Sequence, residues 1–288
     1  MTPAQPEPTT FEVPPEADGA TAKLAGEAVG DGPPIVLLHA LSATRHNVVH
    51  GSRHLLHRGY RLVAYDARGH GESPPPEDRR AYEYGDLVAD LGAVLADLRI
   101  ERPVLVGVSM GAATAVAFAL ERADDVAALV QVTPAYTGVP ATGSDELREW
   151  DRLADALEEG GIERFAEVAS EGAPERWREH LREATRQRLG RHRHLDAIAN
   201  ALRVVPRSKA FDGIESLDRL DVPALVVGSR DEADSRHPLG VAREYARRLP
   251  HAELAVEDEG ESPLAWQGAR LSRAVADFLE RTGLAAQT

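Results

Sequence analysis

Cysteine is absent from this chain of 288 residues, so the chain can form no disulfide, cysteine–metal site or thiol nucleophile. Long hydrophobic runs are absent too, and no stretch approaches the roughly 20 apolar residues of a membrane-spanning helix. Residues 1–19 lack both the basic start and the apolar stretch of a secretory signal. These absences lead us to expect a cytoplasmic protein.

Positive charge is also scarce, because 33 Lys and Arg residues stand against 47 Asp and Glu residues, for a net charge of −14. This balance disfavours nucleic acid and anionic membranes as partners, and we expect a small-molecule substrate instead. Metal-ligand, P-loop and dinucleotide-binding motifs are missing from the sequence, so no metal or other cofactor is expected. The sequence does not indicate the oligomeric state.

Hydrophobic residues make up 43% of the chain, which is enough for a packed core. Residues 1–18 are rich in Pro, Thr and Glu, and we expect a flexible N-terminal arm there. An alternating stretch over 20–29 predicts an early hairpin. Short apolar runs predict buried strands at 35–38, 62–65, 104–108, 127–132, 224–227 and 253–256. Helical spacing predicts helices at 46–58, 87–98, 112–121, 239–249 and 268–281.

Between these elements, residues 144–205 contain no strand-like run and are dense in Arg, Glu, Ala and Leu. They predict three or four amphipathic helices, broken at Gly160-Gly161, at 172–174 and at Gly190. The whole pattern predicts an α/β fold with a doubly wound, mostly parallel sheet and a helical cap. We expect the core to comprise residues 19–136 and 211–288, and the cap residues 137–210.

A strand-to-helix turn with the sequence Gly107-Val108-Ser109-Met110-Gly111 follows the strand at 104–108. Glycine on both sides lets the chain turn sharply, which exposes the serine between them. The backbone N–H of Met110 and the positive end of the helix then face a substrate bound at this serine. The strand, the motif and a small-residue helix occur together, which favours a nucleophile elbow with Ser109 as the nucleophile.

Two further loops follow predicted strands. In IVLLHALSA, the N–H of Leu41 follows the first buried strand, where it can point toward the same oxyanion. His39 in that loop suits packing at a strand end, although His39 and Ala40 are also candidates to line a substrate pocket. In YDARGHGES we interpret four residues as scaffold, namely Asp66, Arg68, Gly69 and Gly71.

The segments LLHALS, YDARGHGES, VGVSMG and PALVVGS, with the helical insertion, resemble the α/β-hydrolase superfamily over residues 20–280. The nearest likeness is to its capped esterases, lipases, epoxide hydrolases and C–C hydrolases. The resemblance implies that Ser109 is the nucleophile and that the N–H groups of Leu41 and Met110 form the oxyanion hole. Ala40 departs from the glycine that most members have at this place.

The resemblance also implies a catalytic Asp after the strand at 224–227, and two residues compete for that role. Asp231 lies at a common distance from the strand, whereas Asp234 lies at the usual distance from the next helix. We favour Asp234, because its match extends over more residues. His237 is close by in the sequence and has no assigned role, although it borders the expected site and its pocket.

The base is the main departure from the family pattern. A histidine is expected after the strand at 253–256, but Glu261 follows Gly260 there, in the segment EDEGESPLAW. A carboxylate is a weak base unless burial and nearby negative charge raise its pKa. The neighbouring residues Glu257, Asp258 and Glu259 could supply such charge.

We expect an enzyme that acts on a small ester or carbonyl-containing substrate, and the missing histidine leaves three hypotheses. In the first, Glu261 is an atypical general base. In the second, another histidine replaces the expected one, and His237 is the nearest. In the third, hydrolysis has been lost and the pocket binds a ligand or supports another reaction.

The predicted cap carries aromatic residues at apolar positions, namely Trp150, Phe165 and Trp177. They are candidates to line the pocket, and a place in the helix core is the alternative. The basic stretch at 176–194 favours either an anionic substrate or an ordinary solvated helix face.

Overall fold

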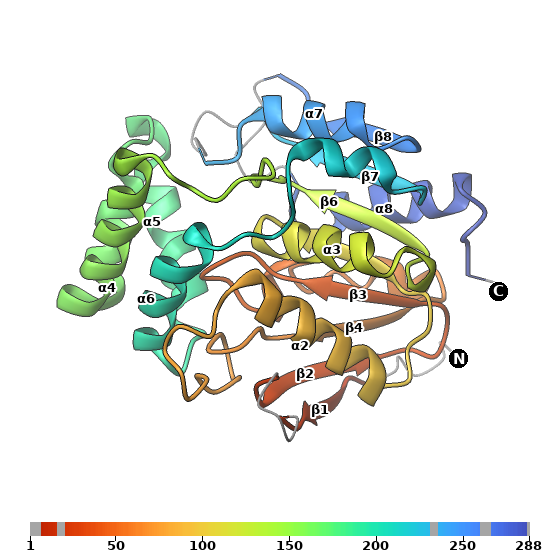
Figure 1. Cartoon of the computed structure of the whole chain (residues 1–288), viewed down its shortest axis with the longest axis horizontal. Coiled ribbons are helices and arrows are strands. Elements are labelled where there is room, and N and C mark those ends of the chain that lie inside the picture. The colour runs from red at the N-terminus through yellow and green to blue at the C-terminus, as the bar shows by residue number, and fades with distance from the viewer. Residues whose placement is uncertain (1–6, 16–20, 231–235, 260–265, 287–288) are drawn as a thin grey trace.

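Eight strands form one sheet in the protein, for which a computed structural model describes residues 7–15, 21–230, 236–259 and 266–286. The strands are β1 (Thr9–Val13), β2 (Leu24–Val29), β3 (Pro34–Leu38), β4 (Arg61–Tyr65), β5 (Val104–Val108), β6 (Ala128–Val132), β7 (Ala224–Gly228) and β8 (Ala252–Val256). Their order across the sheet is β1-β2-β4-β3-β5-β6-β7-β8 (Figure 1). β2 is antiparallel to β1 and to β4, and every other pair is parallel. The predicted fold class is confirmed.

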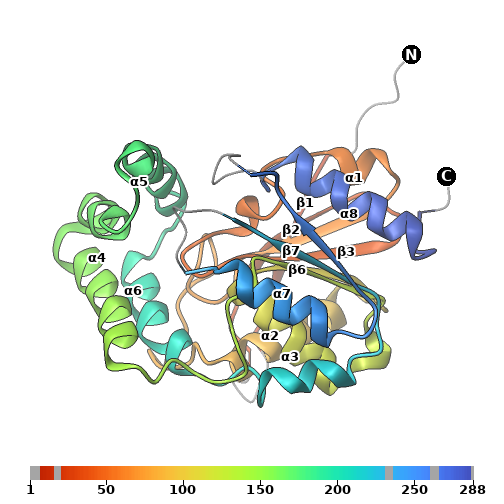
Figure 2. The ribbon, with the colours of Figure 1, turned by 90° about the horizontal axis from the view of Figure 1, so that it is seen from above.

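Helices cover both faces of the sheet, as Figure 2 shows. α2 (Tyr84–Asp97), α3 (Met110–Glu121) and α7 (Leu239–Arg248) pack on one face. α1 (His54–His57) and α8 (Ala269–Arg281) pack on the other. This covering explains why the central strands are continuous apolar runs, because a strand buried on both faces has no polar side.

Two expectations for the N-terminal third are wrong in part. The stretch 1–18, expected to be an arm, contains strand β1, which pairs with β2 and buries Val13. The predicted helix over 46–58 is replaced by a 3-10 turn at Arg45–Asn47 and by the single turn of α1. His50 and Gly51 interrupt it, since their φ angles of 45° and 72° are incompatible with a right-handed helix.

The insertion between β6 and β7, for which we keep the name cap, is helical, as its composition predicts. It consists mainly of α4 (Ser144–Ser170), α5 (Glu175–Leu189) and α6 (Leu195–Val204), which lie together beside the sheet (Figure 1). α4 is kinked rather than ended at Gly161, where φ is 63° and ψ is −154°. These helices share a hydrophobic cluster of their own, which includes Leu153, Phe165 and Ile198. None of the described helices is long and apolar enough to cross a bilayer.

A buried ion pair fixes α2 to the loop after β4. The Nε atom of Arg68 lies 2.7 Å from Oδ2 of Asp90, and its Nη2 lies 2.7 Å from Oδ1. Both side chains are almost completely buried, and Arg68 also pairs with Asp86 at 3.0 Å, so the charge of Asp90 is compensated by Arg68. Arg68 therefore has the scaffold role that the sequence indicates for its segment.

We expect Asp90→Ala to lower the free energy of unfolding by about 3 kcal/mol, because it removes the bonds to Nε and Nη2 of the buried Arg68 and leaves the partly exposed Asp86 as its ionic partner. Urea denaturation followed by circular dichroism measures the change. Asp212→Ala is the control, since Asp212 pairs with Lys209 at the surface and its loss should cost less than about 1 kcal/mol. Equal losses in the two variants would contradict the importance of burial.

Candidate functional site

The turn from β5 into α3 has the geometry of a nucleophile elbow. Ser109 has φ 50° and ψ −105°, a conformation that side-chain-bearing residues seldom adopt. A Cβ added to Gly107 would lie 2.3 Å from the carbonyl oxygen of Gly111. One added to Gly111 would lie 2.3 Å from the carbonyl oxygen of Leu38. Only glycine allows α3 to start this close to β3 and β5, and the tight turn leaves Ser109 partly exposed.

His237 lies within hydrogen-bonding distance of this serine. Its Nε2 atom is 2.8 Å from Oγ of Ser109, although 128 residues separate the two in the chain. His237 belongs to the segment between β7 and α7, directly before Pro238, and its side chain is half-buried. The structure thus brings together the predicted nucleophile and His237, the histidine that the second hypothesis names as the nearest replacement for the expected base.

The carboxylates expected at the site fall in segments that the structure does not describe. Asp231 and Asp234 lie in 231–235, and Glu261 lies in 260–265. Their positions relative to Ser109 and His237 therefore lie outside the described residues.

The two residues expected to form an oxyanion hole occupy suitable elements. Met110 is the first residue of α3, where the backbone N–H groups of the first turn are free of helical partners. Leu41 lies in the loop after β3, which turns through a bond from Ala43 N to Ala40 O and through Ser42, with φ 60°. The side chain of Leu41 packs against the cap cluster.

His39 is a buried residue with both ring nitrogens engaged by the backbone. Its Nε2 accepts a hydrogen bond from Ala67 N at 2.9 Å, so its Nδ1 carries the proton and donates to Ala40 O at 2.8 Å. Burial lowers the pKa of His39. Neither ring nitrogen is available to a substrate.

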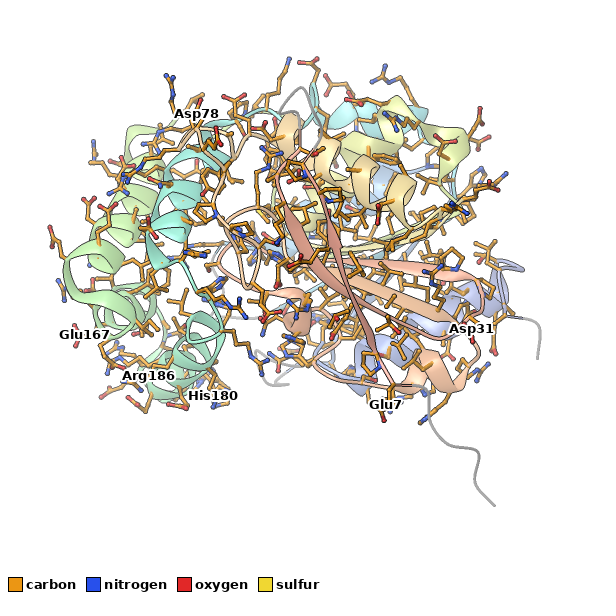
Figure 3. The ribbon with its side chains drawn as sticks, turned by 90° about the horizontal axis from the view of Figure 1, so that it is seen from below. Glu7, Asp31, Asp78, Glu167, His180 and Arg186 are labelled. Atoms are coloured by element: carbon orange, nitrogen blue, oxygen red, sulfur yellow. The ribbon has the colours of Figure 1, made fainter. Side chains whose placement is uncertain are left out.

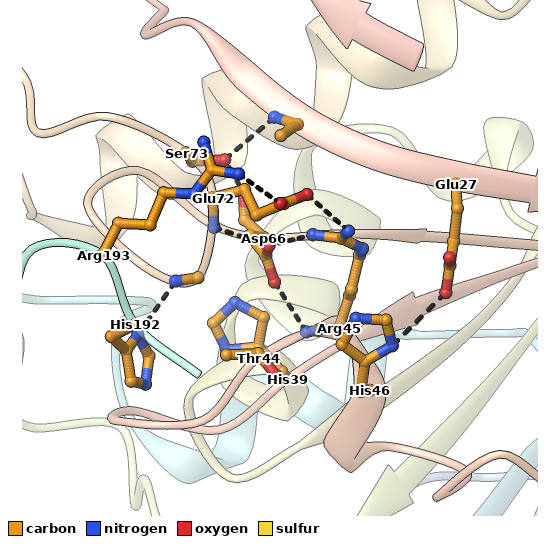
Figure 4. A network of polar contacts seen from close by, with 12 residues as sticks. Glu27, His39, Thr44, Arg45, His46, Asp66, Glu72, Ser73, His192 and Arg193 are labelled. Atoms are coloured by element: carbon orange, nitrogen blue, oxygen red, sulfur yellow. Dashed lines mark hydrogen bonds and ion pairs between the residues drawn. The ribbon is translucent and has the colours of Figure 1, made fainter. Parts of the chain in front are cut away.

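A chain of charges joins the loops after β3 and β4 to the cap (Figure 4). Asp66 is completely buried and accepts hydrogen bonds from the backbone N–H groups of Arg45 and Glu72, at 2.8 and 3.0 Å. The guanidinium of Arg45 bridges Asp66 and Glu72, and Glu72 in turn accepts from Arg193 of the cap at 2.6 Å. Arg45 is not recognisable from the sequence, because a lone arginine in a loop resembles a surface residue.

His192 attaches the cap to the loop that carries Leu41. Its Nδ1 accepts from Gly71 N at 2.9 Å, and its Nε2 therefore donates to Ser42 O at 3.2 Å. Its ring lies 5.7 Å from that of His70, which lies 5.0 Å from that of His39. Burial lowers the pKa of His192 to about 4 and also lowers that of His70. All three rings are therefore neutral at pH 7, which suits a cluster so tightly packed.

The aromatic residues of the cap divide between core and helix surface. Phe165 is buried in the cap cluster. Trp150 packs against that cluster, and the guanidinium of Arg236 lies 5.7 Å from its ring centre. Trp177 is half-buried, with the guanidinium of Arg176 at 5.9 Å from its ring.

Two arginines of the basic stretch at 176–194 pair with glutamates of the cap. Arg186 pairs with Glu163 at 3.0 Å and with Glu179 at 3.2 Å, and Arg182 pairs with Glu179 at 3.5 Å. Arg186 lies with His180 on the part of the cap remote from the sheet (Figure 3). These contacts favour the solvated-face interpretation over an anionic-substrate site for these arginines.

Glu257, which the sequence leads us to expect only as a source of negative charge near Glu261, is buried, with 3% of its surface exposed. Its Oε1 accepts from Ser229 Oγ at 2.8 Å and from the backbone N–H of Arg230, both just after β7. Its Oε2 accepts from Trp266 Nε1 at 2.9 Å, ahead of α8. Glu257 thus joins the ends of β7 and β8. Among the described residues, no cluster of His, Asp or Glu could hold a metal ion.

Comparison with known proteins shows what this arrangement is similar to. A family model described as alpha/beta hydrolase fold matches residues 33–267. Epoxide hydrolase 3 of Siraitia grosvenorii is 37% identical over 106 residues, which are 37% of this chain and 34% of that protein. The AB hydrolase superfamily protein YisY of Bacillus subtilis (strain 168) is 33% identical over 118 residues, 40% of this chain and 43% of that protein. These matches thus span well under half the length of each relative.

Among solved structures, a malate-bound thermophilic esterase from Thermogutta terrifontis is similar over nearly the whole chain. The TM-score is 0.76 at 22% identity, and the match covers 95% of this chain and 98% of the esterase. At this identity the likeness shows the fold.

The free energy of unfolding should fall as the pH drops from about 6.5 to about 4, because the unfolded chain protonates His192 before the folded protein does. The lowered pKa of His192 corresponds to a loss of about 3 kcal/mol over this interval. His192→Gln should make the pH dependence shallower without abolishing it, because the pKa values of His39 and His70 are lowered too. An amide at position 192 can accept from Gly71 and donate to Ser42 without titrating. Urea denaturation at several pH values tests this, with exposed His180→Gln as the matched cap control. Equal slopes for His192→Gln and the wild type would contradict the assignment.

Proposed function

Because the chain belongs to the α/β-hydrolase fold family, we propose that it is a serine hydrolase acting on a small ester or carbonyl-containing substrate. The observation that carries the proposal is the 2.8 Å separation between His237 Nε2 and Ser109 Oγ. A serine hydroxyl needs an adjacent base to become a nucleophile, and imidazole is well suited to that task. The epoxide hydrolase and esterase among the similar proteins support hydrolysis of a small molecule.

In the proposed reaction, His237 accepts the hydroxyl proton as Oγ of Ser109 attacks the substrate carbonyl carbon. The N–H groups of Leu41 and Met110 stabilise the negative charge that develops on the carbonyl oxygen. His237 then donates its proton to the leaving group as the bond to that group breaks. Water, deprotonated by His237, hydrolyses the acyl-enzyme and regenerates Ser109.

In this assignment the base and the acid exchange the positions in the chain that they usually have in the family. His237 comes from the segment after β7, where the family resemblance implies the acid, while Glu261 follows β8 in the sequence, where it implies the histidine. We propose that Glu261 serves as the carboxylate that orients the imidazole, with Asp234 and Asp231 as the competing residues. A carboxylate in this role fixes the tautomer and stabilises the imidazolium that forms.

Ser109→Ala should abolish both ester turnover and labelling by a fluorophosphonate probe, and His237→Ala should lower kcat by about a thousandfold or more. Added imidazole should restore part of the activity of His237→Ala, because it can occupy the space of the missing base. Exposed His251→Ala is the matched control and should behave as the wild type. The measurement is turnover of a panel of short acyl esters, together with probe labelling. Absence of both in the wild-type protein would refute the serine hydrolase and favour a ligand-binding role.

The role of Glu261 is tested by the conservative variant Glu261→Gln, beside Asp234→Asn and Asp231→Asn. Neutralising the carboxylate that orients the imidazole should lower kcat by about ten-thousandfold, as loss of the triad acid does in other serine hydrolases. We expect this loss in Glu261→Gln and little change in the two aspartate variants. If Glu261 is itself the base, Glu261→Gln abolishes labelling while His237→Ala retains it, and that result would overturn the reversed assignment.

A further inference from the structure

The two neighbouring residues Arg236 and His237 contact different parts of the molecule. The imidazole of His237 reaches Ser109 in the core, whereas the guanidinium of Arg236 reaches helix α4 of the cap. There, Arg236 Nη2 donates to Glu149 Oε1 at 2.9 Å, and the guanidinium lies over the ring of Trp150, 5.7 Å from its centre. One side of this segment is therefore held by the cap at the residue directly before the proposed base.

Ser109 has a different kind of support. It is fixed by the packing of α3 on β3 and β5, and by the bond from its N–H to Val132 O at 3.1 Å. These contacts lie wholly within the core. The separation between Oγ and Nε2 thus depends on the segment between β7 and α7, where Arg236 contacts the cap and Leu239 packs on the core.

The contact of Arg236 with α4 is too exposed to contribute much to folding. The side chains of Arg236 and Glu149 retain 34% and 48% of their exposure, and such pairs add little to stability. Its effect is on the orientation of the Arg236 side chain, because a carboxylate binds the edge of the guanidinium and an indole packs on its face. Contacts on two sides of the Arg236 side chain limit the orientations that the next residue, His237, can adopt.

We propose that Arg236 is a positioning residue that holds His237 against Ser109 by way of Glu149 and Trp150 on α4. The base is then correctly placed only while the cap is docked on the core. This inference rests on the proposed serine hydrolase function.

The test compares kcat, KM and melting temperature for Arg236→Ala, Arg236→Lys and Glu149→Gln on a short acyl ester. Arg236→Ala and Glu149→Gln should lower kcat by roughly ten- to a hundredfold, because a displacement of about 1 Å at the reacting groups has that effect. The rate of fluorophosphonate labelling should fall in parallel, while KM and the melting temperature change little. Arg236→Lys keeps the charge and should recover part of the rate. The double variant should be no slower than Arg236→Ala, since both changes break one contact.

Asp151→Asn provides the matched control. Asp151 lies on α4 two residues from Glu149 and pairs with Arg207 of the cap at 2.8 and 2.9 Å, away from the His237 segment. Its variant should retain wild-type kcat. Wild-type kcat in Arg236→Ala, or an equal loss in Asp151→Asn, would overturn the positioning role. If those results occur while Ser109→Ala and His237→Ala abolish turnover, the proposed function stands and only this inference fails.

Discussion

The close approach of α3 to β3 and β5 is the constraint on which the site depends. Gly107 and Gly111 leave no space for a Cβ, and the first turn of α3 consequently lies against the backbone of Leu38. The strand must turn into the helix within one residue, which places Ser109 at φ 50°. Because the parallel strands run in one direction, the loops after β3, β4 and β7 end around the same edge as this turn.

The cap contacts the core through polar groups as well as through an apolar cluster that α6 shares with the start of α3. His192 and Arg193 bind the loops after β3 and β4, and Arg236 reaches from the segment after β7 to α4. His192 is buried and neutral, because burial lowers its pKa. Arg45 and Asp66, which are linked to Arg193 through Glu72, are buried as an ion pair. These polar contacts add directional constraints on the cap to the non-directional packing of the apolar cluster.

Local patterns explain why most of the fold was predictable. The strands at the centre of the sheet and the elbow at Ser109 depend on short runs of residues, and the structure has them within one or two residues of the predicted bounds. The strand in Thr9–Val13 was missed, because Pro and Thr around it suggest a coil while its stability comes from pairing with β2. The helix over 46–58 was overextended, because helical spacing does not reveal the left-handed turn at His50 and Gly51.

The candidate site was less predictable, since its contacts join loops that are far apart in the sequence. Ser109 was identifiable from five residues, whereas the contact with His237 spans 128 residues and depends on the path of the segment after β7. Glu257 was misread for the same reason. Its partners Ser229, Arg230 and Trp266 come from three separate segments, so a run of acidic letters gave no sign of burial.

The buried carboxylate of Glu257 also limits which segments of this fold can be exchanged with those of another protein. The segments that follow β7 and β8 share it, so neither segment is an independent module for grafting from another protein. A transplant that replaced residues 229–238 alone would remove the Ser229 hydroxyl that donates to this carboxylate, and a transplant of residues 257–266 alone would separate the carboxylate from that donor. The unit of exchange is the pair of segments together, with Trp266 as its far boundary.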